Sequence, residues 1–198
     1  MHEAWIALAV GAAYLLGSVD FGVIVARIRG VDIYGAGSGN PGATNVLRSI
    51  GRKAAALVMV GDLAKGVAAA AIGWGAGGRT VGFGAGLAAV VGHCFPVWHR
   101  FRGGKGVAAT GGMILFLQPI LGAILVAVWV AGVALTHKAS VSSLVVAVAL
   151  VPGLVAFGER GWPLLWSGVA CLLIVVRHSG NIRRLLAGSE LDIEEAAH

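Results

Sequence analysis

Charge is scarce in this sequence, and acidic residues are scarcest. Only 12% of its 198 residues are charged, and nine are Asp or Glu. A soluble globular domain carries about twice that share of charge. The low charge excludes a disordered chain, a coiled coil and an ordinary soluble domain. The chain has only two cysteines, both within apolar stretches. They offer neither a disulfide framework nor the ligand spacing of a metal site.

What the chain has instead is apolar side chains and glycine. Hydrophobic residues make up 58% of it, and 32 residues are glycine without a Gly-X-Y period. Glycine inside apolar runs is typical of helices that pack closely in a bilayer. We therefore predict an all-α integral membrane protein, a compact bundle of seven transmembrane helices, some of them short or half-helices. The predicted segments are 4–26, 54–73, 80–98, 106–118, 120–136, 141–157 and 162–178.

The basic residues are distributed unevenly between the connecting segments. Twelve of the fifteen follow the first, third, fifth and seventh segments, whereas only Arg79 and Arg160 lie on the opposite side. Because cytoplasmic loops are enriched in Lys and Arg, this predicts an N-terminus outside and a C-terminus in the cytoplasm. We expect one seven-span domain over residues 1–187 and an acidic cytoplasmic tail over 188–198. Nucleic acid is not an expected partner, because the cations lie between apolar spans.

Polar residues concentrate on the predicted cytoplasmic side, first in the run GSGNPGATNVLR at 37–48. Glycines let backbone N–H groups approach an anion, and short polar side chains with an arginine suit a phosphate. A match to G-x-G-x-x-G in this run is rejected as a dinucleotide fingerprint, because no predicted strand precedes it. The candidate anion-binding residues are Gly37, Ser38, Gly39, Asn40, Thr44, Asn45 and Arg48.

Three further clusters lie on the same side. Lys105 stands in a glycine-rich stretch with Gly104 and opens a helix, which makes an anion site. Ser140 and Ser143 begin another helix, where serines can also serve as caps. His178, Asn181 and Arg183 follow the seventh segment. Asp62 and Lys65, at positions i and i+3 of the second segment, are spaced to form a buried ion pair.

These runs resemble a known family. The stretches GSGNPGATNVLR (37–48), GHCFPVWHRFRGGKGVA (92–108) and RHSGNIRRLLAGSE (177–190) are similar to those of the bacterial acyl-phosphate:glycerol-3-phosphate acyltransferases, the PlsY family. The resemblance covers nearly the whole chain. It departs at Asp20, where the family usually has proline, at 137–139, and at Arg183, which replaces a usual lysine.

The resemblance implies a seven-span membrane enzyme with its site facing the cytoplasm. Its reaction would transfer a fatty acyl group from acyl phosphate to the 1-hydroxyl of glycerol 3-phosphate, giving lysophosphatidic acid and phosphate. Catalytic roles would fall to Ser38, Arg48, Lys105 and His178. Substrate-binding roles would fall to Gly37, Gly39, Asn40, Thr44, Asn45, Gly104, Ser140, Ser143, Asn181 and Arg183.

Several expectations accompany this assignment. The proton acceptor is either His178 or a phosphate oxygen of the substrate, and we favour a positioning role for His178. We expect no metal and no cofactor. We expect a monomer in contact with membrane lipid, for which an enzyme that produces acyl phosphate is a candidate partner. The alternative function is a small membrane transporter or channel for an anionic solute, since glycine-rich broken helices and intramembrane charges also occur there.

Overall fold

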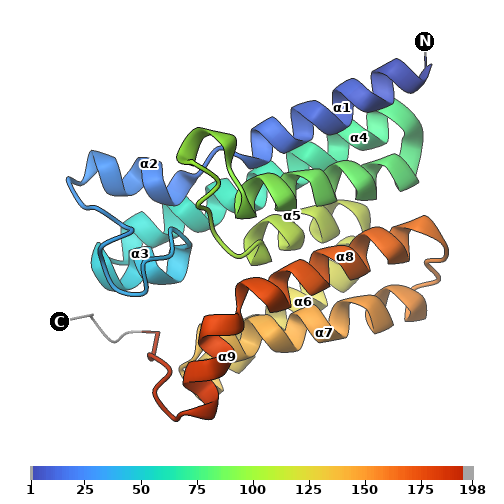
Figure 1. Ribbon diagram of the computed structural model, residues 1–198. Coiled ribbons are helices and arrows are strands. Elements are labelled where there is room, and N and C mark those ends of the chain that lie inside the picture. The colour runs from blue at the N-terminus through green and yellow to red at the C-terminus, as the bar shows by residue number, and fades with distance from the viewer. Residues whose placement is uncertain (1, 194–198) are drawn as a thin grey trace.

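The computed structural model describes residues 2–193, and within that range every regular element is a helix (Figure 1). The predicted residues 194–198 of the acidic tail lie outside the described range. The elements are α1 (His2–Gly17), α2 (Phe21–Ile28), α3 (Ala43–Ser49), α4 (Arg52–Cys94), η1 (Val97–His99), α5 (Val107–Leu117), α6 (Pro119–Thr136), α7 (Ala139–Ala156), α8 (Trp162–Arg177) and α9 (Ser179–Leu186).

Helix α4 is a hairpin of two helices. Gly77 and Gly78 have non-helical backbone angles, and Gly78 has a φ of +75°, which glycine adopts without strain. The chain reverses there, and the two halves approach so closely that a Cβ on Gly73 would lie 2.5 Å from the Cβ of Ala85. The second and third predicted segments are therefore the two halves of α4. The other five correspond to α1 with α2, and to α5, α6, α7 and α8, so the predicted helical membrane fold is confirmed.

Length and apolar composition support several membrane crossings. Within the described residues, four helical stretches are long and apolar enough to span a membrane, with the whole α4 region counted as one of them. A fifth is added if α8 and α9, bent by 53° at their junction, form one span. Helix α5 has only 11 residues, in agreement with the half-helix expected after Lys105.

Small residues bring the helices into backbone contact. A Cβ on Gly92 of α4 would lie 2.3 Å from the carbonyl oxygen of Tyr14 in α1. A Cβ on Gly112 of α5 would lie 2.0 Å from the carbonyl oxygen of Leu63 in α4. Lipid supplies no hydrophobic driving force for helix association, so close packing of the backbones matters more. Glycine permits this packing. One apolar cluster joins α4, α5, α6 and α7 and contains Phe83, Met113, Leu121, Leu150 and Leu154.

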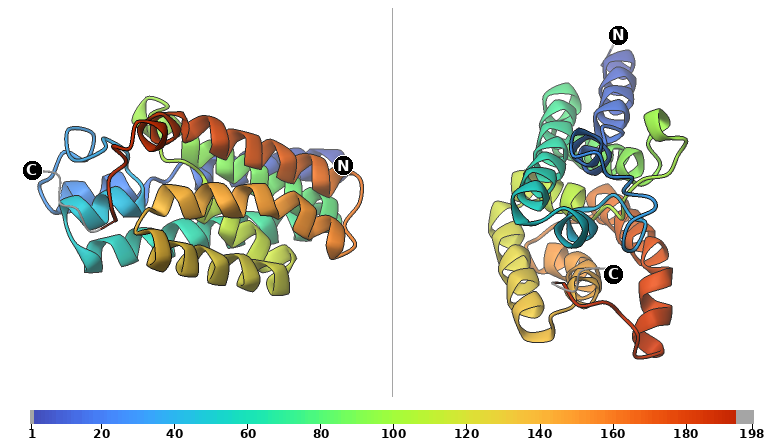
Figure 2. Two further views of the ribbon diagram at one scale, coloured as in Figure 1. Left: turned by 90° about the horizontal axis from the view of Figure 1, so that it is seen from below. Right: turned by 90° about the vertical axis from the view of Figure 1, so that its left-hand side faces the viewer.

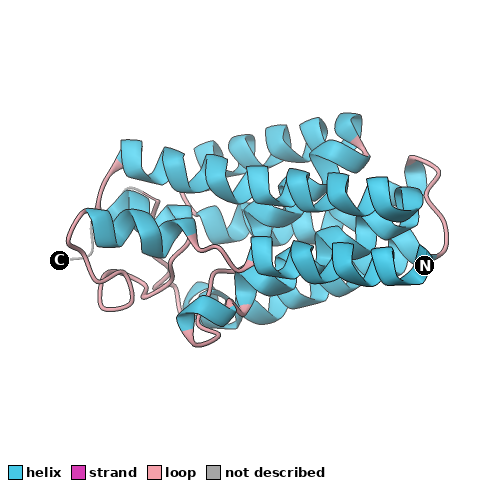
Figure 3. Cartoon of the chain, turned by 90° about the horizontal axis from the view of Figure 1, so that it is seen from above, coloured by secondary structure: helices cyan, strands magenta, loops and turns pink. Residues whose placement is uncertain are grey.

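The two ends of the bundle differ in construction (Figures 1, 2 and 3). One end, called the loop end, gathers α2, α3, α9 and the long connections at 29–42, 95–106 and 187–193. The opposite end, called the turn end, holds only the short connections at Gly77–Gly78, Gln118 and 157–161. Almost all of the polar clusters predicted from the sequence are at the loop end.

Candidate active site

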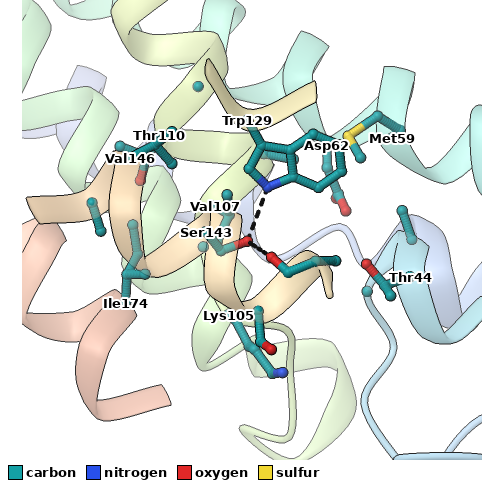
Figure 4. Close-up of a pocket in the computed structure, with 18 of the residues that line it drawn as sticks. Thr44, Met59, Asp62, Lys105, Val107, Thr110, Trp129, Ser143, Val146 and Ile174 are labelled. Atoms are coloured by element: carbon teal, nitrogen blue, oxygen red, sulfur yellow. Dashed lines mark hydrogen bonds between the residues drawn. The ribbon is translucent and has the colours of Figure 1, made fainter. Parts of the chain in front are cut away.

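A cavity of about 320 Å³ opens at the loop end and extends between α4, α5, α6 and α7 (Figure 4). Its inner wall is apolar, with Met59, Leu63, Ile114, Trp129 and Leu150 among the lining residues. Its outer part is polar. The polar and charged residues that line it are Ser38, Asn40, Thr44, Asn45, Arg48, Asp62, His93, Lys105, Thr110, Ser140, Ser143, His178, Asn181 and Glu190.

Asn45 shapes the loop that carries Ser38. Its Oδ1 accepts a hydrogen bond from Ser38 N at 2.8 Å, and its Nδ2 donates to Ala36 O at 2.9 Å. Gly37 has a φ of +54°, and a Cβ there would lie 2.2 Å from Asn45 Oδ1. The loop therefore requires glycine at 37 and asparagine at 45, and the Asn45 amide is occupied with the backbone.

Arg48 joins the cavity to the C-terminal segment. Its Nε donates to Asp192 O at 2.8 Å, and its Nη2 donates to Leu191 O at 2.9 Å. The same segment is fixed on its other side, where Ile193 N donates to His137 O at 2.7 Å. The guanidinium group thus has a defined orientation at the cavity wall.

The loop before α5 holds Lys105. Arg177 of α8 donates from Nε to Gly104 O at 3.0 Å and from Nη2 to Gly103 O at 2.6 Å. The Lys105 ammonium donates to Asn181 Oδ1. Burial lowers the pKa of Lys105 to about 8; Glu190 opposes this shift, whereas Arg184, Arg48 and Arg177 add to it. The cations gathered around Lys105 make this part of the cavity suited to an anion.

Glu190 lines the polar part of the cavity, although it was not predicted as a site residue. It accepts hydrogen bonds from Ser140 Oγ at 2.8 Å, from Asn181 Nδ2 and from Arg184 Nε at 2.8 Å. Burial raises the pKa of this carboxyl group, but the three hydrogen bonds outweigh burial and hold the pKa below its usual value. Glu190 therefore fixes Ser140 and Asn181, and Asn181 in turn receives Lys105.

His178 is buried at the junction of α8 and α9. Its Nδ1 lies 2.8 Å from Ile174 O, so the ring donates from Nδ1 and leaves Nε2 as an acceptor. The two serines at the start of α7 are used differently. Ser143 Oγ donates to Ala139 O at 2.7 Å and accepts from Trp129 Nε1 at 3.0 Å, as Figure 4 shows.

Ten of the predicted residues line one cavity, although they come from four separate stretches of sequence. They are Ser38, Asn40, Thr44, Asn45, Arg48, Lys105, Ser140, Ser143, His178 and Asn181. The predicted glycines, Gly37, Gly39 and Gly104, shape the backbone beside it. Arg183 is exposed and is not among the lining residues, whereas its neighbour Arg184 pairs with Glu190.

His93 is a second cavity residue that was not predicted, although it lies within the run at 92–108. The expected ion pair is present, with Lys65 Nζ 2.8 Å from Asp62 Oδ1. The pair is joined by His93, whose Nδ1 lies 2.8 Å from Lys65 Nζ. Asp62 and His93 line the cavity together. No periodic pattern links residues 28 positions apart, so only the α4 hairpin reveals this contact.

Fold and site together define a class: helical membrane proteins whose cavity joins an anion-binding mouth to an apolar interior. Residues 7–188 match the family model described as glycerol-3-phosphate acyltransferase, and the chain belongs to this family. It is 45% identical over 185 residues to the glycerol-3-phosphate acyltransferase of Rhizobium meliloti (strain 1021), covering 92% of this chain and 89% of the relative. For the enzyme of Pseudomonas syringae pv. tomato the identity is 44% over 181 residues, covering 90% and 93%.

Two solved structures are similar to the whole fold. They are crystal structures of PlsY, an integral membrane glycerol 3-phosphate acyltransferase, in its glycerol 3-phosphate form and its lysophosphatidic acid form. The TM-scores are 0.91 and 0.89, at 37% sequence identity. In both cases 94% of each chain is covered. The family resemblance drawn from the sequence is therefore confirmed, and the protein is a multi-pass membrane acyltransferase.

Proposed function

We propose that this protein transfers a fatty acyl group from acyl phosphate to the 1-hydroxyl of glycerol 3-phosphate. The products are lysophosphatidic acid and inorganic phosphate. The observation that carries the proposal is the two-part cavity, which has cations and polar donors at its mouth and an apolar wall within. An acyl chain fits the apolar part, and two phosphate groups fit the mouth.

Both substrates are anions. Each carries a charge of about −2 near neutral pH, by analogy with a phosphomonoester. We assign the phosphoryl group of acyl phosphate to Ser38, Asn40, the neighbouring backbone N–H groups and Arg48. Glycines at 37 and 39 with left-handed backbone angles support this assignment, because they let the loop curve around an anion. Fixed donors and charge stabilise the departing phosphate without reorganisation.

Lys105 is assigned to the reacting centre. Its ammonium lies in the same cavity as Arg48 and His178, and only the Asn181 amide oxygen is its hydrogen-bond acceptor among the described residues. A cation there stabilises negative charge that develops on the attacked carbonyl oxygen and on the leaving phosphate. Acyl phosphate is a mixed anhydride with a good leaving group, so orientation and charge supply most of the catalysis.

Glycerol 3-phosphate is assigned to the side of the cavity formed by α8 and α9. His178 Nε2 is an acceptor, which suits a hydrogen bond from the 1-hydroxyl. We favour a positioning role for His178, with a substrate phosphate oxygen as the proton acceptor. Asn181 completes this side. Arg183, which is exposed, acts at most from the edge of the mouth.

Phosphate release tests the proposal directly. Purified protein is expected to release inorganic phosphate only when acyl phosphate and glycerol 3-phosphate are both present. Acyl-CoA serves as the comparison donor and is expected to give no thioester cleavage. Equal turnover with acyl-CoA would contradict the assigned donor, and release without glycerol 3-phosphate would make the protein a hydrolase.

The orientation is part of the proposal. We infer that the loop end faces the cytoplasm of a bacterial cell, that residues 1–187 act as one domain and that the enzyme works as a monomer. The loop end holds the great majority of the Lys and Arg residues, which supports a cytoplasmic position. A reporter that is active only in the cytoplasm is expected to be active when it is fused after His198. Activity of a periplasm-specific reporter would contradict this orientation.

A further inference from the structure

A buried group of charged residues lies at the wall of the cavity, and the reaction proposed above gives it no role. Asp62 and Lys65 come from the first half of α4, and His93 comes from the second half. The exposed fractions are 2%, 2% and 4%. Charged side chains at such depth in a membrane protein are costly and usually serve a function.

Lys65 and Asp62 hold one edge of the His93 ring. The Lys65 ammonium lies 2.8 Å from Asp62 Oδ1, donates to Val19 O at 2.8 Å and lies 2.8 Å from His93 Nδ1. The same Nδ1 lies 3.4 Å from Asp62 Oδ1, so it faces both members of the ion pair. These contacts fix the position of the imidazole between the two halves of α4.

The opposite edge of that ring supports the loop that carries Lys105. A Cβ on Gly104 would lie 2.2 Å from His93 Nε2, so the Gly104 backbone rests directly on the imidazole. In addition, Gly104 N donates to His93 O at 3.0 Å. Lys105 is the next residue. Arg177 holds the carbonyl groups of Gly103 and Gly104, so this part of the loop lies between Arg177 and the His93 ring.

We propose that Asp62, Lys65 and His93 form a positioning cluster that sets the place of the Lys105 ammonium in the cavity. Asp62 and Lys65 fix the orientation of the His93 ring, and the ring supports Gly104. Lys105 then reaches the reacting centre from a rigid base. The inference rests on the proposed role of Lys105. It explains why a glycine is required at 104 even though its backbone angle is not left-handed.

His93→Asn is the variant that tests this role. The asparagine Oδ1 can still accept from Lys65, so the buried charge keeps its partner, but the ring beneath Gly104 is lost. We expect kcat to fall about 10- to 100-fold with little change in either KM, because misplacement by about 1 Å has an effect of this size. His99→Ala removes a histidine six residues along that is not a cavity-lining residue, and we expect less than a twofold change.

A second readout does not depend on turnover. The pH dependence of Lys105 acetylation by acetic anhydride, followed by mass spectrometry, measures the pKa of this amine directly. In the wild type we expect about 8, because burial lowers the pKa, Glu190 opposes this shift, and Arg184, Arg48 and Arg177 add to it; His178 is the other titratable group nearby. In His93→Asn the loosened loop exposes the amine, and we expect a pKa nearer the ordinary lysine value of about 10.4. An unchanged pKa with kcat within threefold overturns the inference.

Gly104→Ala gives an independent test if His93→Asn does not fold. This variant keeps Asp62, Lys65 and His93 but pushes the loop off the ring, and we expect the same rise in the Lys105 pKa and a similar loss of kcat. The fold-loss of kcat caused by Gly104→Ala is expected to be at least threefold smaller in the His93→Asn background than in the wild type. Strictly additive losses would show that residues 93 and 104 act separately and would overturn the inference. An inactive wild type with the expected pKa shift would instead contradict the proposed function alone.

Discussion

The charged residues at the two ends of the bundle have different surroundings. At the turn end, Arg79 pairs with Glu159, and Gln118 Nε2 donates to Glu159 Oε1 at 3.0 Å. The charge of the arginine is neutralised by a neighbour within the fold. At the loop end, Arg48 and Lys105 line a cavity together with Glu190, and Glu190 pairs with Arg184.

The difference shows how a membrane bundle separates stability from binding. The ion pair between Arg79 and Glu159 links two connections at the turn end and leaves little net charge to attract an anion. At the loop end the Lys105 ammonium donates to an amide oxygen within a cluster of cations, and such a cluster attracts an anionic substrate. Changes at the loop end should therefore affect turnover, and changes at the turn end should affect stability.

The largest expected effect is at the phosphoryl subsite. Ser38→Ala and Arg48→Ala should each lower turnover about 30- to 1,000-fold, because a charge-assisted hydrogen bond in such a site contributes about 2–4 kcal/mol. The measurement is phosphate release by protein whose folding is checked by gel filtration in detergent. Arg29→Ala is the control, since Arg29 is an exposed cation at the same end and does not line the cavity. Near wild-type rates for both site variants would move the phosphate site elsewhere.

Lys105 predicts a pH dependence. Burial lowers its pKa to about 8, so the ammonium is charged below that pH and neutral above it. If the charge is required, kcat/KM should fall about tenfold per pH unit above pH 8. Lys105→Arg keeps its charge throughout this range and should remove the alkaline decline while changing the absolute rate. A decline that persists unchanged in Lys105→Arg would assign the titration to another group.

His178 tests which group accepts the proton. If His178 positions glycerol 3-phosphate, His178→Asn should keep the rate at saturating substrate within about tenfold, because the amide retains hydrogen-bonding capacity. A general base would lose about 10²–10⁴-fold. A loss above about a thousandfold with glycerol 3-phosphate binding intact would make His178 the base. The pH profile alone does not decide, because a phosphate group titrates in the same region as histidine.

Much of this molecule could be predicted because the relevant signals are local. Apolar run length predicted the long helices and the short α5, whereas the short polar helices α3 and α9 were not predicted. The Lys and Arg clusters predicted which connections would meet. Glu190 was assigned to an acidic tail, and only the return of the chain after α9 brings it onto Ser140 and Asn181.

Arg183 shows a signal that was present but not used. In helix α9, Asn181 and Arg184 are three residues apart and share a face, so both can contact Glu190. Arg183 lies two positions from Asn181 and points elsewhere. Helical phase would therefore have favoured Arg184 for an inward contact. The contact between Lys65 and His93 had no such signal, because it depends on the reversal at Gly77–Gly78.

The smallest expected effect on turnover belongs to the turn end. Arg79→Ala should leave phosphate release within about twofold of wild type, but it leaves the buried Glu159 carboxylate with Gln118 and without its arginine. An unpaired buried group of this kind costs about 1–3 kcal/mol, so the midpoint of thermal unfolding in detergent should fall. Arg160→Ala is the matched control: Arg160 is exposed and donates only to backbone carbonyls of Val155 and Glu159, so its loss should lower the midpoint less. A variant Arg79→Ala that unfolds like the wild type but turns over tenfold more slowly would break the separation between the two ends. It would show that the charge at the turn end reaches the site through the helices that connect them.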